Sequence, residues 1–119
     1  MTENKKHSGQ LEPAVAYNMA DLLDYAPGAV VSRTIAKSKA GTVTLFSFDA
    51  GQELSEHTTP YDAYVHVLDG RVRLTIGGKD VVAAAGEIVL MPAGVPHAVH
   101  ADERFKMALI MIRDKAADN

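Results

Sequence analysis

The sequence contains no cysteine and no tryptophan, and only 6% of its 119 residues are aromatic. Without cysteine, the chain has no disulfide bond, thiolate zinc site, iron–sulfur cluster or cysteine nucleophile. Positive charge is not in excess either: twelve lysine and arginine residues stand against fifteen aspartate and glutamate residues, for a formal net charge of -3. We therefore expect no nucleic acid and no anionic membrane surface as a partner, because both need a basic patch.

Long apolar runs are also missing. No segment approaches the roughly 20 residues that a membrane-spanning helix needs, and the polar start of the chain, Met1–His7, does not resemble a secretory signal. We therefore expect a cytoplasmic protein. With 119 residues, 47% of them hydrophobic, the chain can build one packed core but not two. We predict a polar N-terminal arm at residues 1–16, a single domain at 17–112 and a polar C-terminal tail at 113–119.

The hydrophobic pattern predicts one short helix followed by many strands. Asn18 is a favourable N-cap, apolar residues follow it at helical spacing, and Pro27–Gly28 ends the segment, which predicts a helix over residues 18–26. Beyond it the period changes to two. Strands are predicted at residues 30–36, 42–50, 71–76, 80–84, 87–91, 96–100 and 105–112. Short strands punctuated by glycine and proline are typical of an all-β sandwich or barrel.

Two of these strands are apolar on both faces. The first, at residues 42–50, is expected to lie between two layers. The second, at residues 105–112, is expected to have an outer face that needs a cover. A second copy of the chain is the simplest cover, so we predict a homodimer.

Four of the five histidines lie in two short segments, at residues 51–70 and 86–101. The first segment contains Gly51, His57 and Gly70, and the second contains glycine, proline and histidine at Gly86, Pro92, Gly94 and His97. These spacings resemble the two signature motifs of the cupin superfamily, and the resemblance covers roughly residues 42–112. It implies a double-stranded β-helix, that is, a jelly-roll barrel, with the predicted short helix in front of it.

The resemblance also implies that His57 and His97 meet inside the barrel, although 40 positions separate them. Converging imidazoles can bind a divalent metal ion, and we consider iron, manganese, nickel and zinc. The chain departs from the full motif at three positions. Thr59 stands where the family has its second histidine, Ala63 where it has glutamate, and Ala101 where it has asparagine. The predicted metal site is therefore reduced to two histidines.

Around this pair we expect a small-molecule pocket lined by Thr59, Tyr61, Asp62 and Met91. Asp62 is the nearest carboxylate, but it is one residue away from the glutamate position. A one-residue offset normally turns a side chain to the opposite face, so Asp62 could be a ligand only if a bulge or an irregular loop redirected it.

The remaining histidines are expected outside the site. Strand parity places His66 and His100 on the outer faces of their strands, where a hydrogen-bonded structural role is the simpler interpretation, and His7 lies in the arm.

The sequence leaves the function open between three hypotheses. The first is a small cupin enzyme that uses a metal ion at His57 and His97. The second is a non-catalytic module that senses a small ligand. The third is a metal-independent sugar isomerase or epimerase, in which a histidine acts as general base beside Tyr61 or Tyr64. No catalytic residue can be assigned from the sequence.

Overall fold

The computed structural model describes residues 10–113, which form nine β-strands and one short 3-10 helix, Met19–Asp21. The strands are β1 (Val30–Ser38), β2 (Gly41–Phe48), β3 (Glu53–His57), β4 (Tyr61–Asp69), β5 (Arg71–Ile76), β6 (Lys79–Ala84), β7 (Ile88–Met91), β8 (His97–His100) and β9 (Phe105–Arg113). Within the described range, no helix has the length and apolar character needed to cross a membrane.

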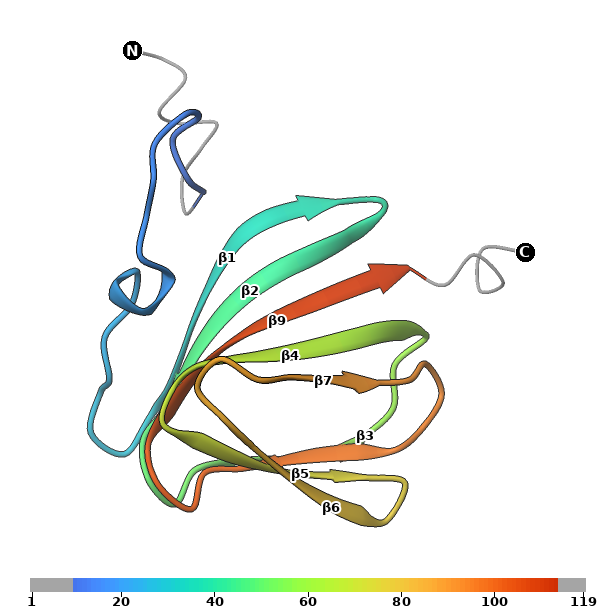
Figure 1. Ribbon diagram of the computed structural model, residues 1–119. Helices are drawn as coiled ribbons and strands as arrows, with labels where there is room; N and C mark the ends of the chain where they lie inside the picture. The colour runs from blue at the N-terminus through green and yellow to red at the C-terminus, as the bar shows by residue number, and fades with distance from the viewer. Residues whose placement is uncertain (1–9, 114–119) are drawn as a thin grey trace.

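The strands form two antiparallel sheets that face each other (Figure 1). The five-stranded sheet has the order β1-β2-β9-β4-β7, and the four-stranded sheet has the order β3-β8-β5-β6. Neighbours in each sheet are mostly distant in sequence, as in a jelly roll. The predicted all-β jelly-roll fold is confirmed.

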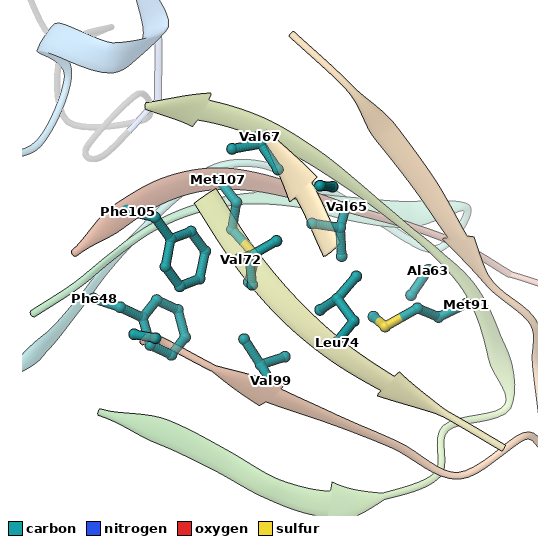
Figure 2. Close-up of a cluster of buried hydrophobic side chains, with 12 residues drawn as sticks. Phe48, Ala63, Val65, Val67, Val72, Leu74, Met91, Val99, Phe105 and Met107 are labelled. Atoms are coloured by element: carbon teal, nitrogen blue, oxygen red, sulfur yellow. The ribbon is translucent and has the colours of Figure 1, made fainter. Parts of the chain in front are cut away.

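The core fills the space between the sheets with side chains that alternate along the strands. Phe48 and Phe105 stack at 4.7 Å between ring centroids and are fully buried, which contributes roughly 0.5–1.5 kcal/mol beyond their area burial. Figure 2 shows this pair at one end of the core and Met91 with Ala63 at the other. The aromatic pair is a cross-strand pair of β2 and β9 within the five-stranded sheet, and it fills one end of the core.

The predicted helix over residues 18–26 is wrong in extent, because only the 3-10 turn Met19–Asp21 forms. Asn18 caps this turn as expected, with its side chain accepting a hydrogen bond from the amide of Ala20. The apolar residues that follow pack on the outer face of the five-stranded sheet: Leu23 joins Leu45 and Ala108 there. Contact with the sheet, rather than helix formation, therefore fixes this segment.

Of the predicted N-terminal arm, residues 10–16 contain no helix or strand, and residues 1–9 lie outside the described residues. Of the predicted tail, Arg113 is the last residue of β9, and residues 114–119 lie outside the described residues.

Candidate functional site

The site lies at the open end of the barrel, on the right of Figure 1, where two loops lie beside each other. Loop 58–60 connects β3 to β4, and loop 92–96 connects β7 to β8. The amide of Gly94 donates a hydrogen bond to the carbonyl of Thr59 at 2.9 Å. This bond joins the two loops, so the residues at their ends share one rim.

His57 and His97 meet at this rim. His57 ends β3, His97 begins β8, and the two residues are paired across the four-stranded sheet. Their ring centroids are 4.4 Å apart, with an interplanar angle of 68°. The register between β3 and β8 is irregular between Leu54 and His57, which indicates a bulge just before the histidine.

Each imidazole is oriented by a backbone carbonyl two residues earlier. His57 Nδ1 lies 2.8 Å from the carbonyl oxygen of Ser55, and His97 Nδ1 lies 3.2 Å from that of Val95. A carbonyl oxygen can only accept, so each Nδ1 carries the proton and donates it. Both Nε2 atoms then keep their lone pairs, which is the form that binds a metal ion or accepts a ligand proton.

Burial lowers the pKa of the His97 imidazole, and the neighbouring His57 lowers it further, against an opposing effect of the Val95 carbonyl. His97 is only 4% exposed, whereas the His57 side of the pair is open to solvent. His97 is therefore neutral at pH 7, and His57 presents the accessible ring.

Asp62 does not join the histidine pair. Its carboxylate oxygen Oδ1 accepts a hydrogen bond from the amide of Ala93 at 2.9 Å. β4 keeps a regular register with β9 through this position, so no bulge redirects Asp62, and the adjacent Ala63 faces the interior at 1% exposure. Asp62 thus braces the loop that leads to His97. No group of three or more His, Cys, Asp or Glu side chains suited to a metal ion occurs among residues 10–113.

The three other predicted pocket residues also have structural contacts at this end. The Thr59 hydroxyl accepts a hydrogen bond from the amide of Tyr61 at 2.9 Å and lies 3.0 Å from the Tyr61 carbonyl oxygen, to which it donates. Met91 is 2% exposed and belongs to the core beneath the rim. Tyr61 lines a cavity of about 230 Å³, with its ring 5.8 Å from the guanidinium carbon of Arg113.

The other two histidines of the motifs lie on outer faces, as strand parity predicts. His66 pairs with Ala108 on the outer side of the five-stranded sheet. His100 Nε2 lies 3.1 Å from the Thr75 hydroxyl, and its Nδ1 lies 3.2 Å from a Glu53 carboxylate oxygen. Neither contributes to the rim.

Sequence reasoning missed two lysines that line the Tyr61 cavity. Lys37 and Lys39 lie at the tip of the β1–β2 hairpin, together with Ser38 and Thr42. Their spacing in the sequence is typical of an exposed hairpin, so nothing in it indicated a cavity. A larger, more open hollow of about 460 Å³ lies beside the same hairpin and includes Ile35, Val43 and Ile110.

A β-barrel with two histidines at one end agrees with the two cupin motifs found in the sequence. The cupin domain family matches residues 44–113, so the chain belongs to the cupin family.

The chain is similar in structure to a conserved protein of unknown function from Streptococcus pyogenes, SPY1581. The two share 33% identity at a TM-score of 0.84, over 89% of this chain and 93% of that one. A cupin superfamily protein from Desulfitobacterium hafniense, DSY2733, is 27% identical at a TM-score of 0.83, over 88% of this chain and 96% of that one. An uncharacterized protein of Streptomyces coelicolor, SCO3923, is 36% identical over 59 residues. That match spans 50% of this chain and 56% of the relative.

Proposed function

We propose that the open end of the barrel binds a small organic molecule at the His57–His97 pair, and that one divalent metal ion takes part in this binding. The observation that carries the proposal is the pairing of two imidazoles 4.4 Å apart whose Nδ1 atoms both face carbonyl oxygens. Their Nε2 lone pairs are the free donors at the rim. A short distance between two such rings allows one ion to contact both.

The donor set suits a first-row metal ion but does not fill its coordination sphere. Neutral imidazole is a good ligand for iron, nickel and zinc, and a weaker one for manganese. With two protein ligands, the other positions fall to water and to the small molecule. A metal ion bound there would supply Lewis acidity toward an oxygen atom of that molecule.

The residues of the chain have distinct parts in this proposal. His97 holds a neutral ring in place, because burial keeps it unprotonated. His57 presents an exposed ring to the incoming molecule. Asp62 and Thr59 hold the two rim loops, so they position the histidines without contacting the ligand.

Metal binding is tested by dialysing metal-free protein against zinc or nickel and measuring metal per chain by elemental analysis. We expect one ion per chain in the natural protein and in the control His66→Gln, whose histidine lies on the outer face. Loss of an outer partner of a metal ligand already costs roughly 10- to 100-fold in affinity. His57→Gln and His97→Gln, which remove a direct ligand, are expected to lose at least as much.

Two results contradict the metal site. One is natural protein that takes up no metal, and the other is a His66→Gln variant that loses as much affinity as His57→Gln. Circular dichroism of each variant separates loss of a ligand from loss of the fold.

Ligand sensing without turnover is the second candidate function. It is favoured by the absence, within residues 10–113, of a third metal-binding side chain beside the pair. To test it, a small organic acid or sugar is bound to the protein, recovered and analysed by mass spectrometry. A ligand that binds and is recovered unchanged supports this candidate over an enzyme.

We also propose that the protein is a homodimer, and its expected cytoplasmic location stays a prediction. The basis for the dimer is the outer face of the five-stranded sheet, where Ile88, Leu90 and Ile112 are 58%, 44% and 50% exposed. Apolar side chains gathered on one sheet face are typical of a protein interface.

A further inference from the structure

An irregularity in the edge strand β1 changes which side chains face the barrel interior. Thr34 pairs with Thr44, and their hydroxyl oxygens are 3.1 Å apart on the interior side of the sheet. The register then shifts, so that Ala36 pairs with Val43 and Lys37 with Thr42. One extra residue in a strand reverses the alternation beyond it. Lys37 therefore lies on the interior side, whereas an unbroken strand would turn it outward.

Lys37 completes a row of interior-facing residues that crosses all five strands. Thr42 pairs with Met111, Met111 with Ala63, and Ala63 with Met91. The bulge adds a cation to the β1 end of this row, beside Thr42. Bulges are frequent next to functional sites because they redirect a side chain in this way.

The cavity at this point is lined by cations. Its volume is about 230 Å³, and Lys37, Lys39 and Arg113 all line it, with Tyr61 and Thr42. No carboxylate occurs among the described residues that line it. Three cationic side chains line this one cavity, although the formal net charge of the whole chain is -3. This local charge favours an anionic group.

The cavity shares the open end of the barrel with the histidine pair. Tyr61, which lines it, begins β4 directly after loop 58–60, and that loop starts from His57. The bond between Gly94 and Thr59 ties the same loop to the one that leads to His97. The cavity and the histidine pair therefore lie at the same end of the barrel, connected by loop 58–60.

We infer that the small molecule is an organic anion, and that its acidic group, a carboxylate or a phosphate, binds between Lys37, Lys39 and Arg113. This inference rests on the proposed function in one respect: it assumes that the rest of the bound molecule extends to the histidine pair. The guanidinium fork matches the two oxygens of an acidic group, and the lysines supply mobile point charges. Tyr61 adds a hydroxyl and an aromatic surface beside them.

The acidic group is tested with succinate and inorganic phosphate as probes, at constant ionic strength, and with neutral succinamide as the uncharged match. Binding is followed by nuclear magnetic resonance of the amides of Gly41, Thr42 and Tyr61. We expect saturable shifts of these amides with succinate, with phosphate or with both, and none with succinamide. Whichever probe binds more tightly identifies the acidic group. Failure of both anions, or equal binding of succinamide, overturns the inference.

Variants locate the site. Lys37→Gln and Lys39→Gln are expected to weaken binding of the anion by roughly fivefold or more, because each removes a charge-assisted contact. Arg71→Gln is the control, since it removes the same charge from the first residue of β5, which pairs with Ala84 in the four-stranded sheet, whereas the cavity is lined from the five-stranded sheet. Equal weakening by Arg71→Gln, or unchanged binding in Lys37→Gln, overturns the inference.

Metal uptake separates this inference from the proposed function, because metal binding and anion binding are measured independently. Anion binding that depends on Lys37 in a protein that takes up no metal supports the cavity and refutes the metal site. Metal uptake that depends on His57, with no binding of either anion, refutes the cavity and supports the metal site.

Discussion

Single polar side chains in this protein hold loops by bonding to backbone amides. Asp49 is the strongest case: its carboxylate accepts hydrogen bonds from the amides of Gly28 at 2.6 Å and Ala50 at 2.9 Å. Asp62 does the same for Ala93. Carboxylates used in this way fix the path of the chain around the barrel.

The two amides, Gly28 first and Ala50 second, lower the pKa of the Asp49 carboxyl below its usual value. A lowered pKa means that the unfolded chain binds more protons between the two values, so stability rises with pH across that window. The contribution of Asp49 is complete above the ordinary carboxyl pKa of about 3.9. It is lost as the pH falls through the lower, folded-state value.

We therefore expect Asp49→Asn to be less stable than the natural protein at pH 7, with the difference shrinking at pH 2–3. The free energy of unfolding from urea titrations at several pH values measures this. An equal difference at pH 7 and at pH 2.5 contradicts the assignment.

The resemblance to the cupin motifs implied that His57 and His97 meet, and their ring centroids are 4.4 Å apart in the structure. The sequence did not predict the use of the Asp62 carboxylate, since a hydrogen bond to Ala93, 31 residues away, leaves no local trace. Lys37 was missed for a similar reason: its direction depends on a bulge, and the bulge depends on the register with β2.

At the scale of elements, the turn between β4 and β5 carries the chain from one sheet to the other. Gly70 occupies it with a φ of +73°, and a Cβ atom there would lie 2.4 Å from the carbonyl oxygen of Arg104. The atoms nearest to this Cβ belong to the backbone at the start of β9, so a side chain at position 70 could be accommodated only if β9 moved.

We expect Gly70→Ala to cost more stability than Gly78→Ala, its matched control. Gly78 has a similar φ of +82° but no atom within 4 Å of an added Cβ. The control isolates the cost of the left-handed conformation, about 1–2 kcal/mol, and Gly70→Ala adds the collision with Arg104. Urea denaturation measures both; equal losses contradict the steric argument.

The alternation of apolar residues was enough to predict β5, whose Val72 and Leu74 face the core. β9 was predicted from a run that is apolar on both faces, and one of these faces lies in the core. β3 was not among the predicted strands, because its mostly exposed residues carry little apolar pattern. The N-terminal segment was mistaken for a full helix because its apolar spacing suits helical packing. In the structure those side chains contact the sheet from an irregular backbone.

At the scale of the whole molecule, the outer face of the five-stranded sheet is divided. One part is covered by the segment after Asn18, which is tied down by Lys106, whose Nζ donates to the carbonyl of Ala20 at 2.6 Å. The other part, with Ile88, Leu90 and Ile112, faces solvent in the single chain. The proposed dimer would use this second part.

We expect the natural protein to sediment as a dimer, and Leu90→Lys and Ile112→Lys to sediment as monomers, because a buried, unpaired ammonium is costly. Val82→Lys is the control: Val82 is 58% exposed but lies on the four-stranded sheet, and this variant should stay dimeric. A monomeric natural protein, or a dimeric Leu90→Lys variant, contradicts the proposed interface.

The stacked rings of Phe48 and Phe105 lie at the opposite end of the strands from the rim. Selection for fold and selection for ligand can therefore act on separate parts of the same strands. Exchanges at positions 37 and 42 are open to evolution, and to laboratory libraries, as a means of changing specificity while the scaffold is retained.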